Sequence, residues 1–172
     1  MRFEALELFV TFRNRSLSQR HAFLAVTAAA GLFLSACTST PEVTGPKYQE
    51  PIAATVSASG NANPSPSGSA TPTAVEIFVL KSPGRFQSLD YFQLKGGSAL
   101  GDDLVERKTV SVRPGESAQL TINPGTEGAY AGVIAGFRDI ENARWRALTP
   151  VTGMSRLNIS VGKLSVSASA GK

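Results

Sequence analysis

The feature that most constrains this fold is a series of short alternating segments separated by proline and glycine turns. From Ile52 to Ala58, apolar residues alternate with small or polar ones, a period of two that is typical of a half-buried strand. The segment 73–80 (TAVEIFVL) is largely apolar on both faces. We therefore expect a central strand whose second face is covered, with 83–95 as the candidate cover. Further strand-like segments occur at 108–112, 118–122, 129–137, 155–161 and 163–167.

Turn residues and glycines indicate how these strands connect and pack. Arg113-Pro114-Gly115-Glu116 is typical of a type II turn, because Pro fixes φ at one position and Gly accepts a positive φ at the next. It predicts a hairpin or a corner between two strands. Gly132 and Gly136 lie on one face of the 129–137 strand. The missing side chains predict that another element approaches this strand closely.

Helical signals are few and short. Ser88 is the expected N-cap of a helix over 88–94, and the leucine spacing predicts a second helix over 99–107. Both fall between the second and third strands. The chain is therefore predicted to be mainly β, a β-sandwich over 52–168 with two short helical inserts between the second and third strands and a tail at 169–172.

The first 36 residues have the order of a secretory signal peptide. Residues 1–21 carry four arginines, and a 13-residue apolar run at 22–34 follows. Thirteen helical residues are too few to span a bilayer, which takes roughly 20. Leu34-Ser35-Ala36-Cys37 resembles a bacterial lipobox, which implies removal of residues 1–36 and acylation of Cys37. The alternative is a plain signal peptide followed by an incidental Cys.

Residues 37–51 are predicted to form a flexible periplasmic tether. The segment after Cys37 is polar, contains Pro41, Gly45 and Pro46, and has no apolar periodicity. The alternative is a first strand laid along the sheet. Thr38 stands where the enterobacterial sorting pattern places Asp in retained lipoproteins, so that resemblance implies a lipid anchor in the outer membrane with the domain facing the periplasm.

Composition excludes several classes of chemistry. The chain has one Cys, Cys37, and one His, His21, which lies in the predicted signal peptide. After removal of the signal peptide, the chain therefore lacks the residues for a zinc-ligand set, a Ser/His/Asp triad or an internal disulfide. We expect no metal and no cofactor. The net charge of +4 comes from basic residues scattered among carboxylates, so a nucleic-acid partner is not expected either.

The connection between the first two strands is the leading candidate for a functional segment. Residues 60–72 (GNANPSPSGSATP) contain three prolines and no hydrophobe larger than Ala. A hairpin needs only two to five residues, so a connection of this length is either functional or disordered. Prolines reduce the entropy lost when a partner orders a loop, which favours recognition. A mobile surface loop is the alternative.

Two charged groups have structural and functional interpretations. Asp102, Asp103 and Glu106 could supply the paired carboxylates of a hydrolase, but a solvated helix start explains them better. The segment after the 129–137 strand is interpreted as an internal brace rather than a ligand site, with Asp139 paired to an arginine and Trp145 capping the core. The residues assigned to this brace are Arg138, Asp139, Arg144 and Trp145.

An ordered set of motifs resembles one family. It comprises Val75-Glu76-Ile77-Phe78-Val79-Leu80-Lys81-Ser82, Phe86, Asp90-Tyr91-Phe92, Leu100-Gly101-Asp102-Asp103-Leu104, Arg113-Pro114-Gly115-Glu116, Phe137-Arg138-Asp139-Ile140 and Arg144-Trp145-Arg146. Together with the lipobox upstream, the set over roughly 52–165 resembles the outer-membrane lipoprotein of the type VI secretion system, the TssJ (SciN) family.

The resemblance implies a transthyretin-like β-sandwich that anchors the secretion membrane complex by holding the periplasmic C-terminal domain of the inner-membrane subunit TssM. It implies no enzymatic activity and no small-molecule substrate. The family's contact loop falls between the first two strands, and its side chains in this chain are small and uncharged. The partner-binding residues so implied are Asn61, Ala62, Asn63, Pro64, Ser65, Pro66, Ser67, Gly68 and Ser69.

Two rival functions remain at this point. A periplasmic carbohydrate- or ligand-binding sandwich would need an exposed aromatic platform, whereas most aromatic residues after Cys37 lie in predicted strands or amphipathic helices. An envelope hydrolase using Asp102 or Asp103 would need a cleft with a perturbed carboxyl group.

Overall fold

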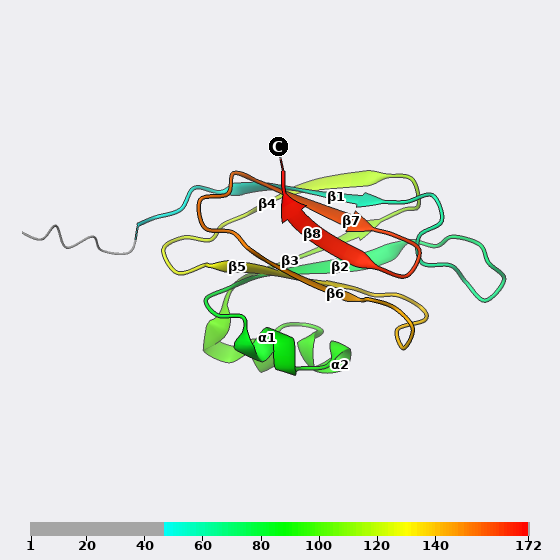
Figure 1. The fold of residues 1–172 in the computed structure, drawn as a ribbon, viewed down its shortest axis with the longest axis horizontal. Coiled ribbons are helices and arrows are strands. Elements are labelled where there is room, and N and C mark those ends of the chain that lie inside the picture. The colour runs from blue at the N-terminus through cyan, green and yellow to red at the C-terminus, as the bar shows by residue number, and fades with distance from the viewer. Residues whose placement is uncertain (1–46, 172) are drawn as a thin grey trace, which may run out of the picture. The chain divides into compact units, whose positions relative to one another are not determined.

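Two four-stranded sheets form the domain in a computed structural model that describes residues 47–171 (Figure 1). One sheet has the strand order β4-β1-β7-β8 and the other has the order β3-β2-β5-β6. The strands are β1 (Ile52–Ala58), β2 (Thr73–Leu80), β3 (Leu104–Val112), β4 (Ser117–Ile122), β5 (Tyr130–Ala135), β6 (Arg146–Pro150), β7 (Arg156–Val161) and β8 (Val166–Ala170). The predicted fold class, a mainly β sandwich with short helices between the second and third strands, is confirmed.

The core between the sheets follows from the alternation along the strands. On β1, Ile52 and Val56 are fully buried, and they belong to the same cluster as Val75, Ile77 and Val79 of β2. Each such side chain contributes about 1.5–3 kcal/mol when it is fully removed from water. Ala53, Thr55 and Ser57, which alternate with the buried residues of β1, are more exposed, so this strand turns one face toward the core.

Three short helical segments cover the outer face of the second sheet (Figure 1). They are α1 (Gly84–Ser88), α2 (Tyr91–Leu94) and a 3-10 segment, η1 (Ser98–Asp103). Phe86, Leu94 and Leu100 from these segments form a second buried cluster with Phe78 and Leu80 of β2. The prediction that the 83–95 segment covers the second apolar face of β2 is therefore confirmed.

Glu76 on the same face of β2 links the cover to the sheet. Its side chain is almost fully buried, and its Oε2 accepts hydrogen bonds from Arg107 Nε at 2.8 Å and from the Gly96 N–H at 3.1 Å. A buried carboxylate is costly unless it is paired and hydrogen-bonded. Glu76 therefore fixes the position of the chain between α2 and η1.

Two glycines of the β5 region allow the helical cover to approach. A Cβ built on Gly132 would lie 2.7 Å from Phe86 Cε2, and one on Gly136 would lie 2.9 Å from the Tyr91 hydroxyl oxygen. Both distances are shorter than real Cβ contacts allow. The predicted close approach to these glycines is confirmed, and the approaching groups are the aromatic rings of α1 and α2.

We expect Gly132→Ala to lower the free energy of unfolding by about 1–3 kcal/mol, because the added methyl group must displace the buried Phe86 ring. Chemical denaturation monitored by circular dichroism measures this loss. Gly60→Ala is the matched control, since nothing lies within 4 Å of a Cβ at that position. Equal stability of the two variants would show that the cover is loosely packed.

The helical boundaries differ from the sequence-based expectation. Asp90, not Ser88, caps α2: its carboxylate accepts from the Gln93 N–H and its own N–H donates to Gln93 Oε1, a capping box. In place of the helix predicted over 99–107, the structure has the 3-10 segment Ser98–Asp103, which Gly101 interrupts with a φ of +55°. Leu104 to Arg107 continue as β3 and pair with β2 instead.

Two points of the predicted strand pattern also need correction, and one open alternative is decided. β6 was not predicted, and it pairs with β5 from Arg146 to Pro150. The turn at 113–116 is a corner, one of the two predicted alternatives, since β3 and β4 belong to different sheets. β8 spans Val166–Ala170, so the last strand lies later than the predicted 163–167 and takes in part of the predicted 169–172 tail.

The chain is already fixed to the domain just before β1. The Gln49 N–H donates to the Gly125 carbonyl at 2.8 Å, and its Nε2 donates to the Gly128 carbonyl at 2.7 Å. The end of the predicted tether is thus bound to the sandwich. The predicted signal peptide, Cys37 and the rest of the tether up to residue 46 lie outside the described residues. Within residues 47–171, none of the helices has the length and apolar character needed to cross a membrane.

Candidate functional site

The loop between β1 and β2 lies at the end of the sandwich away from the point where the chain enters it. The chain joins β1 at Ile52 and leaves that strand at Ala58, and the 60–72 loop projects beyond the opposite end in Figure 1. The connections 136–145 and 162–165 reach the same end, since Asn63 bonds to residues in both regions. The loop and these two connections therefore form one end surface.

Asn63 holds the loop to its neighbours. It is buried and adopts a left-handed φ of +48°, a conformation that Asn tolerates better than most residues. Its Oδ1 accepts from the Arg138 N–H at 2.8 Å, its Nδ2 donates to the Pro72 carbonyl at 3.0 Å, and its N–H donates to the Lys163 carbonyl at 3.0 Å. Through its side chain and its N–H, Asn63 thus links the 60–72 loop to the 136–145 and 162–165 connections.

Beyond Asn63 the loop forms a small exposed hairpin. Pro64 bridges Ala70, and the Ser65 N–H donates to the Ser69 carbonyl at 2.8 Å. Residues 66–69 at the tip are exposed. The loop therefore presents backbone groups, small hydroxyls and a proline ring on a fixed base.

The structure divides the predicted partner-binding residues into two groups. Ala62 and Asn63 are buried, so they act as the internal support of the loop and offer no surface to a partner. Asn61 and the residues Pro64 to Ser69 remain at least partly accessible. A deletion that includes Asn63 would consequently disturb the whole end surface rather than the tip alone.

A hollow lies beside the tip. It has a volume of about 420 Å³ and is lined by Pro64, Ser65, Pro66, Arg138, Asp139 and Leu164. The Arg138 Nε donates to Thr71 Oγ1 at 3.2 Å, and that hydroxyl donates to the Asn63 carbonyl at 2.6 Å. Arg138, predicted as part of an internal brace, thus lies at the surface beside the loop.

The contacts of Asp139 and Arg144 differ from those predicted for the brace. Asp139 accepts hydrogen bonds from the backbone and side chain of Asn142, and no ion pair with an arginine occurs for it within the described part of the chain. Arg144 contributes through its backbone, which bonds to the Leu164 carbonyl and the Val166 N–H. The predicted pairing of Asp139 with an arginine was therefore wrong.

Arg146 performs the bracing that was assigned to its neighbours. Its Nη1 donates to the carbonyls of Phe86, Gln87 and Leu89, at 2.9, 2.8 and 3.1 Å, around the end of α1. Its guanidinium carbon lies 4.9 Å from the centre of the Trp145 ring, which in turn packs edge-on against Tyr91 at 5.5 Å. β6, which begins at Arg146, was not predicted. The contacts of Arg146 with α1 and with the Trp145 ring were therefore not predicted either.

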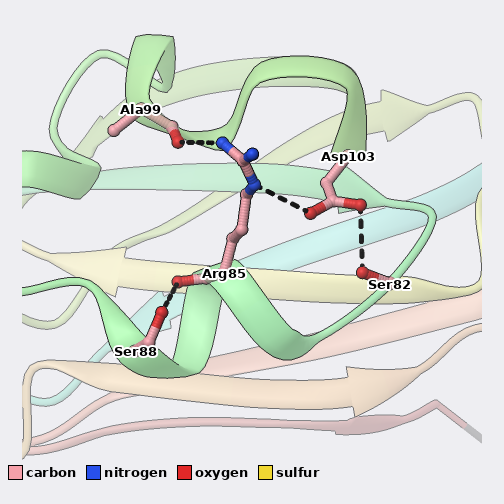
Figure 2. Close-up of polar contacts among 5 residues, drawn as sticks. All are labelled: Ser82, Arg85, Ser88, Ala99 and Asp103. Atoms are coloured by element: carbon pink, nitrogen blue, oxygen red, sulfur yellow. Dashed lines mark hydrogen bonds and ion pairs between the residues drawn. The ribbon is translucent and has the colours of Figure 1, made fainter.

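The acidic residues considered for hydrolysis are engaged separately. Figure 2 shows Asp103 accepting from Ser82 Oγ at 3.0 Å and facing Arg85 Nε at 3.7 Å, while Arg85 Nη1 reaches the Ala99 carbonyl at 3.4 Å. Asp102 is exposed. These contacts connect α1, η1 and the end of β2. They give the Asp103 carboxylate a structural role that requires no substrate.

Glu106 points to another part of the molecule, where it connects the two sheets. Its carboxylate accepts from the Asn123 N–H at 2.7 Å and from Asn123 Nδ2 at 2.9 Å, and it pairs with Lys108 at 3.1 Å. Burial raises the pKa of Glu106, but these hydrogen bonds and the Lys108 charge outweigh it, so the pKa lies below its ordinary value. A carboxyl group with a lowered pKa is a poor general acid.

This lowered pKa predicts a pH-dependent contribution to stability. The ionised form is favoured in the folded state, so the contribution is present above the unfolded pKa, near 4.5, and is lost as pH falls through the folded pKa. We expect Glu106→Gln to cost about 1 kcal/mol at pH 7 and less at pH 3. Denaturation at both pH values tests this, and Asn123→Ala should reproduce the loss. A cost independent of pH would contradict it.

Two further observations bear on ligand chemistry. Among residues 47–171, no group of three or more His, Cys, Asp or Glu side chains is placed to hold a metal ion. The large exposed hydrophobic residues in this part of the chain are Tyr48 and Phe92, which lie on the tether and on α2. They do not form the shared aromatic platform that a carbohydrate-binding sandwich would need.

Comparison with known proteins identifies a family. The family model described as "Type VI secretion lipoprotein, VasD, EvfM, TssJ" matches residues 50–164. The type VI lipoprotein TssJ1 from Pseudomonas aeruginosa is 31% identical with a TM-score of 0.66, covering 71% of this chain and 96% of that one. Among curated proteins, no sequence matches significantly.

Two other solved structures share the fold at lower identity. Serratia marcescens Lip, a membrane-bound component of the type VI secretion system, is 20% identical with a TM-score of 0.63, over 69% of this chain and 96% of that one. A chain in the structure of the TssM C-terminal domain from EAEC is 23% identical with a TM-score of 0.60, over 70% of this chain and 98% of that one. At these identities the likeness shows the fold alone.

Proposed function

Because this chain belongs to the type VI secretion lipoprotein family, we propose that it anchors the secretion membrane complex to the outer membrane by binding the periplasmic C-terminal domain of the inner-membrane subunit TssM. In this proposal the chain acts by binding and not by catalysis. Acyl chains on Cys37 hold the membrane, and the loop at Asn61 to Ser69 holds the partner.

The observation that carries the proposal is that the tether and the loop join opposite ends of one strand. The chain enters β1 at Ile52, and β1 leads to the loop after Ala58 (Figure 1). A pull between membrane and partner would therefore pass along the covalent backbone of β1. This strand pairs with β4 on one side and with β7 on the other. The hydrogen bonds of both pairings would hold β1 in the sheet under this load.

The chemistry of the loop suits a protein partner. Its exposed tip has no charged or large side chain, so binding energy would come from backbone hydrogen bonds and the proline faces. Asn63 and the bridge between Pro64 and Ala70 hold the tip in a fixed shape. A pre-organised loop loses little conformational entropy on binding, which offsets the lack of large anchoring side chains.

Two structural neighbours support the choice of partner. A chain of this fold occurs in the structure of the TssM C-terminal domain from EAEC. Another occurs in a structure described as the type VI membrane complex, with 22% identity and a TM-score of 0.62. For this chain, the partner is inferred from family membership together with the exposed loop.

Replacing Ser65–Ser69 by Asn-Gly should weaken capture of the TssM C-terminal domain at least about tenfold, since it removes the tip but keeps a turn that can close the Pro64–Ala70 bridge. The melting temperature should change by no more than about 2 °C. Isothermal titration calorimetry and thermal denaturation measure the two quantities.

A point variant pair provides the matched control. Ser67→Arg places a large charged side chain on the exposed tip, and Ser160→Arg places the same side chain at an exposed position on β7. Ser67→Arg should reduce capture of the TssM C-terminal domain, and Ser160→Arg should not. Unchanged capture by both tip variants would move the contact away from this loop.

A further inference from the structure

A groove lies at the end of the sandwich where the chain enters. It has a volume of about 630 Å³ and lies between the tether, the β4–β5 connection and the β6–β7 connection. Tyr48, Ala129 and Met154 contribute apolar surface to it, and Thr152 and Ser155 contribute hydroxyl groups. The groove is at the opposite end from the 60–72 loop, and the proposed partner contact does not use it.

Tyr48 is displayed at this groove by a rigid support. Its side chain is 58% exposed although it is large and amphipathic. The next residue, Gln49, is fastened to the Gly125 and Gly128 carbonyls through its N–H and its Nε2. The position of Tyr48 is thus set by the β4–β5 connection, and its exposure is a property of the folded domain.

The length of chain before the groove limits how far it can lie from the proposed anchor. Cys37 lies ten positions before Lys47, which lines the groove. A chain of that length spans at most about 35 Å even when it is fully extended. If Cys37 is acylated, this is therefore the end of the domain that the chain holds within about 35 Å of the acylated residue.

The charges around the groove are balanced, so contact with a phospholipid surface would not depend on anionic lipid. Glu127 is neutralised by Lys81 at 2.9 Å, and the tether contributes one cation and one anion, Lys47 and Glu50. The surface is therefore close to neutral and combines apolar atoms with hydroxyl groups. Tyrosine is enriched at membrane interfaces because its ring is apolar and its hydroxyl group can remain in the hydrated layer.

We propose that this groove is a membrane-contact surface, in which Tyr48 and Met154 rest in the headgroup layer of the bilayer that holds the acyl chains. The inference rests on the proposed lipid anchor. It adds that the domain has a defined orientation: β1, about 23 Å long at 3.3 Å per residue, points away from the membrane and presents the 60–72 loop to the periplasm.

Depth-dependent fluorescence quenching tests the proposal on the mature acylated chain. Tyr48→Trp is compared with Phe92→Trp, a comparably exposed aromatic position on α2, and the wild-type chain supplies the background from Trp145. The vesicles contain phosphatidylethanolamine and phosphatidylglycerol with a fraction of phosphatidylcholine brominated high on its acyl chain. Quenching of the added fluorescence should be at least about twofold at position 48 and slight at position 92.

Other outcomes would overturn different parts of the proposal. Equal quenching at the two positions, or none, while the chain still floats with the vesicles would overturn the membrane contact and leave the lipid anchor intact. Failure of the wild-type chain to float would instead overturn the anchor. If the indole introduced by Tyr48→Trp were protected from aqueous acrylamide in the absence of lipid, the tether or a second copy would occupy the groove, which would also overturn the proposal.

Discussion

Asn63→Ala should lower the free energy of unfolding by about 2–4 kcal/mol and weaken partner capture at the same time. The substitution removes the acceptor of the Arg138 N–H and the donor to the Pro72 carbonyl, both at a buried position. Leaving a buried polar group without a partner costs about 1–3 kcal/mol. Alanine also tolerates the left-handed φ of +48° poorly.

Two comparison variants separate these causes. Asn63→Gly keeps the left-handed backbone without strain but loses the same hydrogen bonds, so its stability should fall between those of Asn63→Ala and the wild type. Asn61→Ala changes an exposed neighbour that bonds to Ser59 and should have little effect. Urea denaturation measures the series. A cost below about 0.5 kcal/mol for Asn63→Ala would show that the loop does not depend on this residue.

Cys37→Ser should release the chain from the membrane completely. Serine lacks the thiol that the acylating enzyme uses, and two acyl chains with about thirty methylenes contribute more than about 20 kcal/mol at 0.8 kcal/mol each. The Tyr48 surface could not replace a contribution of that size. Secretion by the type VI system should be lost with it, because the domain would still bind its partner but would transmit no load.

Cell fractionation and a secretion assay measure the two effects. Ser39→Ala, two residues further along the chain, is a matched control and should behave like the wild type. Retention of Cys37→Ser in the outer-membrane fraction, with secretion intact, would contradict the acyl anchor. Loss of membrane binding with secretion intact would show that anchoring is not what the system needs from this chain.

The strand pattern could be read from the sequence where local alternation and burial agree. β1 and β2 have the predicted bounds, and the two-sided apolar character of β2 correctly required a cover. β6 was missed because Arg146 and Pro150 are atypical of a strand and its pairing with β5 is a tertiary contact. The helix expected to reach residue 107 failed for the same reason: pairing with β2 outweighed a leucine spacing that favours helix.

The candidate site was only partly predictable. The length and proline content of the 60–72 segment made it a candidate functional loop. They could not show which of its residues are buried and support the loop and which are exposed to a partner. Asn63 supports the loop through Arg138 and Lys163, residues far away in sequence that no local pattern connects to it. Asn preceding a proline is compatible with many turns, so the left-handed φ at Asn63 became evident only in the fold.

The central proposal is that this chain links a lipid bilayer to the C-terminal domain of TssM, and vesicle flotation tests that link most directly. The soluble TssM domain is mixed with vesicles carrying the wild-type acylated chain, and its recovery in the floating fraction is measured. The wild type should recruit it. Cys37→Ser should bind it without floating, and the Ser65–Ser69 replacement should float without recruiting it. Recruitment by either variant at the wild-type level would contradict the proposed link.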